Sequence, residues 1–113
     1  MTVLRTVTDV STSPSGAGVA DAFVQAGELL KALSAPVRVA LVTHLHDRGP
    51  MCVHELVDLL DITQPLVSQH LRILRSAAIV RGERRGREVV YALADEHVAR
   101  IVADAVEHVQ EDR

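Results

Sequence analysis

The fold of this 113-residue chain is decided by residues 61–75, which read DITQPLVSQHLRILR. Asp61-Ile62-Thr63 predicts a tight turn into a helix, because Thr63 is a suitable N-cap and Pro65 is tolerated in a first helical turn. At 100° per residue this helix has two faces. One stripe is expected to pack against the core through Leu66, His70, Ile73, Leu74 and Ala77. The polar side chains of the other face, within about 80° of one another, are Gln64, Ser68, Arg72 and Arg75.

A second short helix is expected immediately before the turn, at about residues 52–60, with Val53, Leu56, Val57 and Leu60 buried. Two short helices joined by a three-residue turn describe a helix-turn-helix. Amide, hydroxyl and guanidinium groups on the outward face of the second helix can hydrogen-bond base edges or phosphates. The residues predicted to contact double-stranded DNA on this helix are Thr63, Gln64, Ser68, Gln69, Arg72 and Arg75. An ordinary solvated helix surface is the alternative interpretation.

A β-hairpin is predicted after this helix, at residues 79–93. Val80-Arg81 and Val89-Val90-Tyr91 are β-prone runs on either side of a glycine- and arginine-rich tip at residues 82–87. A hairpin in this position is the wing of a winged helix, so the expected fold is mostly α with a β-hairpin wing. Arg84, Arg85 and Arg87 are predicted to meet phosphates or the minor groove. A winged domain used only for protein contacts stays open, although the basic tip argues against it.

Two further helices are expected upstream of the helix-turn-helix. Apolar residues recur at helical spacing from about Val19 to a break at residues 34–36, and again from Val37 to a closing turn at residues 47–50. Residues 1–18 are rich in Ser, Thr, Gly and Pro and predict a flexible arm. One winged helix-turn-helix domain is therefore expected over residues 19–113.

Composition and charge limit the class of protein. The chain is 48% hydrophobic but only 2% aromatic, which suits a small helical core, and it has no apolar run of the roughly 20 residues that span a bilayer. The net charge is −3, yet six of the twelve basic residues fall within residues 72–87, and acidic residues dominate after residue 94. With a single cysteine, these features predict a cytoplasmic protein without a membrane partner.

The last predicted helix, about residues 95–111, carries four metal-ligand side chains: Asp95, His97, His108 and Glu111. His108 lies eleven positions after His97, which places the two histidines on one face but about 16 Å apart, too far for one ion with Zn–N bonds of about 2.0–2.1 Å. Two copies of the helix packed antiparallel would complete two equivalent sites in a homodimer. The helix also carries an apolar stripe that suits such an interface: Val98, Ile101, Val102, Ala105 and Val109. Solvated surface groups that favour the helix dipole are the alternative.

The run Val53-His54-Glu55-Leu56, residues 64–74, the Gly86-Arg87 wing with Tyr91-Ala92-Leu93, and the last helix together resemble the ArsR/SmtB family of bacterial metal-sensing repressors. The spacing D-x-H-x10-H-x2-E is similar to the C-terminal-helix site of its zinc-sensing branch. The resemblance implies a zinc-responsive transcriptional repressor, in which the metal-free dimer binds an imperfect palindromic operator and leaves it when Zn(II) binds. Independently, two carboxylates and two imidazoles suit Zn(II), with Co(II) as a possible substitute.

A different sensing site of that family, Cys-Val-Cys, is present here only as Cys52-Val53-His54. Cys52 and His54 are candidates for a second metal site, completed by a donor from the N-terminal arm or the other subunit. The alternative function is a winged-helix repressor with a vestigial metal site, which senses redox state through Cys52 or acts constitutively. His54-Glu55 begins an H-E-x-x-H motif, but Asp58 replaces its second histidine, so we expect neither an enzyme nor an organic small-molecule substrate.

Overall fold

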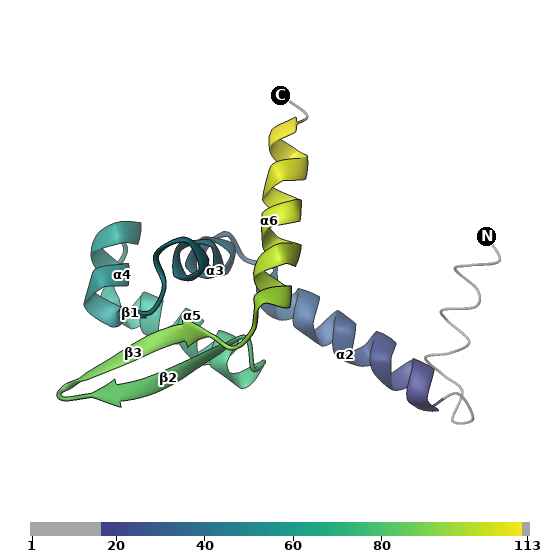
Figure 1. Ribbon diagram of the computed structural model, residues 1–113, viewed down its shortest axis with the longest axis horizontal. Coiled ribbons are helices and arrows are strands. Elements are labelled where there is room, and N and C mark those ends of the chain that lie inside the picture. The colour runs from purple at the N-terminus through teal and green to yellow at the C-terminus, as the bar shows by residue number, and fades with distance from the viewer. Residues whose placement is uncertain (1–16, 112–113) are drawn as a thin grey trace. The chain divides into compact units, whose positions relative to one another are not determined.

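The computed structural model describes residues 17–111, which form five helices and a three-stranded antiparallel sheet (Figure 1). In chain order these are α2 (Ala17–Leu33), α3 (Pro36–Arg48), β1 (Met51–Cys52), α4 (Val53–Leu60), α5 (Gln64–Ser76), β2 (Val80–Arg85), β3 (Glu88–Leu93) and α6 (Glu96–Glu111). The helix-turn-helix is α4 and α5, and the wing is the β2–β3 hairpin. The predicted winged-helix fold is therefore confirmed. None of the described helices is long and apolar enough to cross a membrane.

The N-terminal boundary differs from the prediction. Residues 1–16 of the predicted arm lie outside the described residues, whereas Ala17 and Gly18 already belong to the first turn of α2. The chain divides into two compact units after Lys31, near the end of α2. α2 carries large exposed apolar side chains at Phe23, Val24 and Leu30. The fold of the second unit, from Ala32 onward, places all the predicted site residues.

The core of this second unit lies between α3, α4, α5 and the base of the sheet. Its most deeply buried side chains are Leu41, Val42, Leu56, Val67, Leu71, Leu74 and Ile79. The predicted packing stripe of α5 was correct at Leu74 but wrong at Leu66, which is 39% exposed. Because Leu66 and Val67 are both apolar, the sequence pattern does not decide which of the two faces the core. Packing of α5 against α3, α4 and β2 buries Val67 instead.

The rotated stripe predicts different stabilities for two leucines five residues apart. Leu71 has no exposed surface, so Leu71→Ala should lower the free energy of unfolding by about 2–5 kcal/mol, the cost of a cavity in a packed core. Leu66→Ala removes the same atoms from a partly exposed site and should cost less than about 1 kcal/mol. Urea unfolding at one fixed protein concentration measures both. Equal losses for the two variants would contradict the orientation of α5.

The sheet contains a strand that the sequence did not predict. Cys52, expected at the start of a helix, and Met51 before it form β1, which pairs antiparallel with β3 in the order β1-β3-β2. Met51 lies opposite Tyr91, and Cys52 lies opposite Val90. A two-residue strand has no periodicity to detect, because only its partner 38 residues later defines it. The α4 helix consequently begins at Val53.

The strands of the wing are longer, and its tip is shorter, than predicted. β2 extends through Arg85 and pairs along its whole length with β3, from Val80 opposite Leu93 to Arg85 opposite Glu88. The turn is only Gly86-Arg87, and Gly86 takes a φ of 66°, a left-handed conformation that a residue without a Cβ adopts at little cost. Arg84 and Arg85 are therefore held on a strand rather than on a loop.

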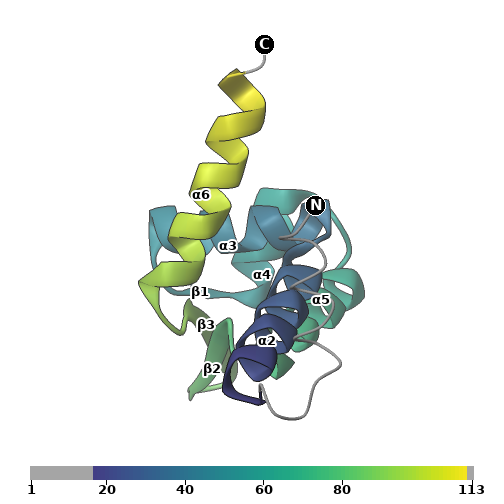
Figure 2. The same ribbon diagram turned by 90° about the vertical axis from the view of Figure 1, so that its right-hand side faces the viewer.

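α6 begins after Asp95, whose Oδ1 accepts hydrogen bonds from the backbone N–H groups of His97 (2.9 Å) and Val98 (3.4 Å). Its first half packs against α3 through Val98, Ala99 and Val102. Its second half projects beyond α3 in both views of the ribbon (Figures 1 and 2). The predicted apolar stripe of this helix is thus divided, since Val98 and Val102 belong to the core of their own chain.

Candidate DNA interface and metal sites

The predicted DNA-contacting residues of α5 share an accessible surface. Thr63, Gln64, Gln69, Arg72 and Arg75 are exposed, and Ser68 is half-buried. Thr63 occupies the N-cap position with an extended backbone, but its side chain makes no capping hydrogen bond. Buried Val67, Leu71 and Leu74 fix the opposite side of the helix in the core. The amide, hydroxyl and guanidinium groups are therefore held outward by a rigid helix.

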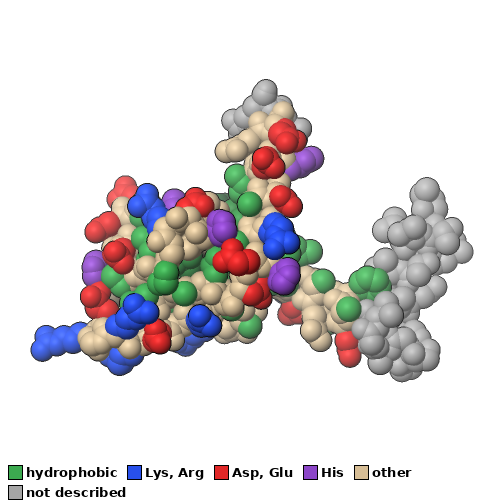
Figure 3. Space-filling view, in the orientation of Figure 1, with side chains coloured by type: hydrophobic (Ala, Val, Ile, Leu, Met, Phe, Trp, Pro, Cys, Tyr) green, Lys and Arg blue, Asp and Glu red, His purple; other side chains and the backbone are tan. Residues whose placement is uncertain are grey.

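The wing arginines are exposed along the β2–β3 hairpin, where Figure 3 shows basic side chains in blue. Arg85 forms an ion pair with Glu83 at 3.1 Å on the same strand. Such an exposed pair contributes little to stability, about 0–1 kcal/mol, and does not prevent a phosphate contact. Within residues 17–111, Arg84 and Arg87 form no ion pair. The wing therefore presents guanidinium groups to any anion that approaches it.

The four predicted ligands on α6 are all exposed and fall into two pairs. Asp95 and His97 lie together at the start of the helix, with Oδ1 and Nδ1 3.7 Å apart. His108 and Glu111 lie in its last turn. Among the described residues of one chain, these four do not join into any group of three or more ligands. Each chain therefore carries two separate pairs of candidate ligands on α6.

An exposed apolar row runs along α6 between these two pairs of candidate ligands. Ile101, Ala105 and Val109 follow His97 at steps of four residues, so each neighbours the one before it in a row that turns by about 40° per step around the helix. Ile101 is 41% exposed and Val109 is 58% exposed. This row is the part of the predicted stripe that the chain's own core does not use.

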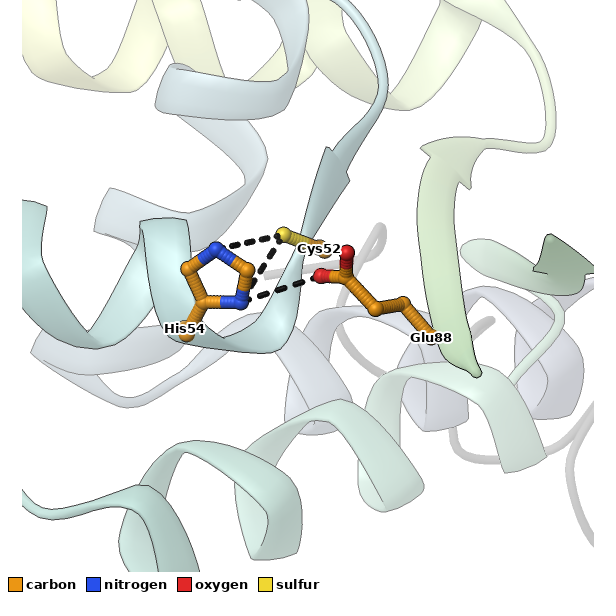
Figure 4. A group of neighbouring side chains, drawn as sticks. All are labelled: Cys52, His54 and Glu88. Atoms are coloured by element: carbon orange, nitrogen blue, oxygen red, sulfur yellow. Dashed lines mark hydrogen bonds and ion pairs between the residues drawn. The ribbon is translucent and has the colours of Figure 1, made fainter. Parts of the chain in front are cut away.

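Cys52 and His54 do lie together, and the structure adds Glu88 from the wing (Figure 4). Cys52 Sγ lies 3.4 Å from His54 Nδ1, and His54 Nδ1 lies 3.0 Å from Glu88 Oε1. Sequence reasoning missed Glu88 because it missed β1. The register explains the meeting: Cys52 faces Val90 across the ladder, and two further steps along each chain reach His54 and Glu88.

A second carboxylate, that of Glu55, contacts the Cys52 thiol. Glu55 Oε1 accepts hydrogen bonds from the Cys52 backbone N–H (2.9 Å) and from the thiol (3.2 Å), which closes the first turn of α4. Burial of the side chain, followed by its hydrogen bond to Glu88, raises the pKa of the Cys52 thiol to about 11. Cys52 is therefore a protonated thiol at neutral pH, and a weak nucleophile.

His70 is a packed and partnered histidine, as its position on α5 predicted. Its Nδ1 lies 3.1 Å from an Arg38 guanidinium nitrogen, and Arg38 also donates from Nε to the Ala32 carbonyl. Burial of the imidazole, and then the charge of Arg38, lower the pKa of His70. The neutral imidazole is thus the form that the folded protein favours.

This arrangement predicts a pH-dependent stability. A histidine whose pKa is lower in the folded than in the unfolded chain contributes fully above the unfolded value of 6.5 and destabilises the fold as pH falls below it. Urea unfolding at pH 7.5 and 5.5 should show this loss. His70→Gln keeps an acceptor for Arg38 but cannot be protonated, so it should lose less stability between the two pH values. An unchanged difference would contradict the assignment.

Comparison with known proteins places these features in a family. The profile of the bacterial regulatory protein arsR family matches residues 35–81, which include the helix-turn-helix. The chain is 63% identical over 87 residues to the HTH-type transcriptional repressor SmtB of Mycobacterium tuberculosis, a match that covers 77% of this chain and 64% of that one. It is 38% identical over 95 residues to the HTH-type transcriptional regulator NmtR of the same species, covering 84% of this chain and 78% of NmtR.

A solved structure agrees with the sequence matches. The transcriptional repressor BigR from Xylella fastidiosa superposes with a TM-score of 0.71 at 34% identity, covering 81% of this chain and 92% of BigR. The chain spans about two thirds of the SmtB repressor's length, 64%, and most of NmtR and BigR. These relatives are transcriptional regulators, in agreement with the expectation that the chain is not an enzyme.

Proposed function

The chain belongs to the bacterial arsR family of regulatory proteins, and on that premise we propose that it is a zinc-responsive transcriptional repressor. In this proposal a metal-free homodimer binds an imperfect palindromic operator and is released when zinc binds between the two α6 helices. The observation that carries it is the exposed side of α6, where an uncovered apolar row separates the two pairs of candidate ligands.

DNA binding is assigned to α5 and the wing. A dimer would present its two α5 helices to successive major grooves, about 34–36 Å apart along the duplex. Gln64, Ser68 and Arg72 are suited to base edges, whereas Arg84 and Arg87 on the wing are suited to phosphates or the minor groove. The negative net charge does not oppose this assignment. Basic residues concentrate in residues 72–87, in α5 and the wing, whereas acidic residues concentrate on α6.

Zinc binding is assigned to Asp95 and His97 of one chain with His108 and Glu111 of the partner subunit. Antiparallel packing of two α6 helices through Ile101, Ala105 and Val109 would bring opposite ends of the helices together. Two carboxylates and two imidazoles are a donor set that fits Zn(II), with Co(II) as a substitute, and they do not favour a metal that selects thiolates. The exposure of all four side chains supports this use, since each is accessible to a second chain. Asp95 also accepts backbone hydrogen bonds at the start of α6.

Release of DNA follows from linkage between the two ligands. Zinc can change DNA affinity only if it binds the DNA-free geometry of the dimer more tightly than the DNA-bound one. Such couplings are typically about 1–3 kcal/mol, or about 5- to 150-fold in affinity. Bridging the α6 helices would supply this preference for the DNA-free geometry by changing the spacing between the two α5 helices of the dimer.

Fluorescence anisotropy tests the proposal with labelled duplex from the region upstream of the protein's own gene. We expect tight binding in chelator and about 5- to 150-fold weaker binding in zinc. A scrambled duplex of equal length and salt concentration measures the nonspecific part. Equal affinity for the upstream duplex in zinc and in chelator would overturn the zinc-sensor function.

Redox sensing through Cys52 is the weaker candidate. Sensor cysteines are exposed and have a low pKa, because the thiolate is the species that oxidants attack. Cys52 is buried, and its pKa of about 11 leaves very little thiolate at neutral pH. The environment of this thiol therefore does not favour redox sensing.

A further inference from the structure

We propose that Tyr91 is a further DNA-contacting residue, whose phenol hydroxyl donates a hydrogen bond to a backbone phosphate held between the start of α5 and the wing. The pattern of basic residues does not point to it, because Tyr91 is uncharged and lies in the middle of β3. The inference rests on the proposed DNA binding by α5 and the wing, but it does not depend on zinc sensing.

Tyr91 lies on the face of the sheet that turns toward the core. Side chains alternate between the two faces of a strand, so Tyr91 shares its face with Met51 and Gly82, its partners on the two neighbouring strands. Met51 is buried on this face, and so is Val80, two residues before Gly82. Arg84, two residues after Gly82, is exposed. Half-buried Tyr91 therefore stands where this face leaves the core and continues into the wing.

The ring of Tyr91 is placed by the strand opposite it. A Cβ added to Gly82 would lie 3.1 Å from Tyr91 Cε1 and 3.1 Å from Val89 Cγ1. Carbon atoms in ordinary contact are about 3.5–4.0 Å apart, so only a residue without a side chain leaves the ring enough space here. The close approach to Gly82 limits the directions that the hydroxyl of Tyr91 can take.

The hydroxyl itself is left without a protein partner. Among residues 17–111, the side chain of Tyr91 forms no hydrogen bond. Its oxygen still reaches solvent, because no side-chain nitrogen or oxygen in these residues is both buried and unpartnered. A tyrosine ring that packs in a protein usually directs its hydroxyl to a polar partner. Here the ring is held by the protein while the donor is free for a partner outside it.

Two residues that we assign to DNA line the same pocket as Tyr91. The pocket, of about 320 Å³, includes Gln64, the first residue of α5, and Arg87, in the wing turn. Within residues 17–111 neither side chain forms a hydrogen bond or an ion pair. Amide, guanidinium and phenol groups all donate hydrogen bonds, and a phosphate oxygen accepts them from each. A phosphate at this pocket would therefore meet donors from both proposed DNA-binding elements.

Glu88 also lines this pocket, but its carboxylate is directed elsewhere. Figure 4 shows it turned toward Cys52 and His54, and its Oε1 lies 3.0 Å from His54 Nδ1. Glu88 directly precedes Val89 in β3, so it lies on the opposite face of the sheet from Val89 and Tyr91. The expected place for the phosphate is the side of the pocket formed by Tyr91.

Tyr91→Phe tests the contact, because it removes the hydroxyl and keeps the ring beside Gly82. Fluorescence anisotropy in chelator measures binding to the upstream duplex and to a scrambled duplex of equal length. Both affinities should fall by at least about tenfold, since each subunit of a dimer loses a hydrogen bond to a charged group. The slope of log affinity against log salt should stay unchanged, because an uncharged hydroxyl displaces no counterions.

Gly82→Ala tests the position of the ring. Its Cβ should push the ring of Tyr91 aside, so both affinities should fall although no polar group has been removed. Added to Tyr91→Phe, it should cause little further loss, because both changes act on one contact. Losses that multiply in the double variant would contradict this placement of the hydroxyl.

Thr43→Val is the matched control, because it removes another half-buried hydroxyl, on α3 and outside this pocket. It should leave both affinities unchanged, and the urea midpoint of Tyr91→Phe should equal that of the wild type. An unaltered affinity of Tyr91→Phe, beside a wild type that binds tightly, would overturn the inference and leave the proposed function standing. A loss confined to the upstream duplex would overturn the phosphate contact in favour of a base contact. A wild type that binds neither duplex would overturn both proposals.

Discussion

Replacing His108 by alanine is expected to abolish zinc-dependent release of DNA while leaving the DNA affinity of the metal-free protein unchanged. His108 is exposed in the last turn of α6, so its removal costs the fold little. In the dimer it would supply one of four ligands to each zinc, and both symmetric sites would lose it together. The ratio of DNA affinities in chelator and in zinc should therefore fall from about 5–150 to about 1. Anisotropy titrations under both conditions measure that ratio.

Two controls separate loss of a ligand from a general effect on α6. His46→Ala removes an exposed histidine of α3 that pairs with Glu96, and it should keep the zinc response. Glu111→Gln should weaken the response, whereas Glu107→Gln, one turn earlier on the same helix and also exposed, should preserve it. A zinc response that survives in His108→Ala, or that is lost equally in the Glu107→Gln variant, contradicts the assigned ligand set.

Replacing Arg72 by alanine is expected to remove sequence-specific DNA binding. Arg72 lies in the middle of the exposed polar face of α5, one residue after fully buried Leu71. A bidentate arginine–guanine contact contributes about 1–3 kcal/mol. A symmetric dimer loses it twice, so the free energy of operator binding should weaken by about 2–6 kcal/mol, a loss of at least about thirtyfold in affinity. Binding to a scrambled duplex should change much less, because the wing arginines remain.

Arg87→Ala gives the contrasting result if the wing contacts phosphates. It should weaken binding to specific and scrambled duplexes alike and reduce the slope of log affinity against log salt by about 1 per subunit. Arg48→Ala, at the exposed end of α3, is the control for loss of a positive charge elsewhere. If Arg72→Ala weakens both duplexes equally, Arg72 contacts the DNA backbone and does not read the bases.

The sequence by itself determined the helix-turn-helix, the wing and the positions of the two candidate ligand pairs on the last helix. The turn at residues 61–63, the following helix and the hairpin depend on neighbours within a few residues, so local pattern is sufficient to find them. Helical geometry also separates His97 from His108 and requires a second chain for a four-ligand site. For the same reason the predicted DNA-contacting residues of α5 were found exposed or half-buried.

Only the tertiary structure decided which apolar residues face the chain's own core and which polar side chains meet across the sheet. Val98 and Val102 pack against α3 while Ile101 and Val109 do not, a division that periodicity cannot make within one stripe. Glu88 joins Cys52 and His54 because β1 pairs with β3, and that pairing links segments more than 30 residues apart. Local sequence sets the conformation of each segment, but contacts between distant segments depend on how those segments pack together.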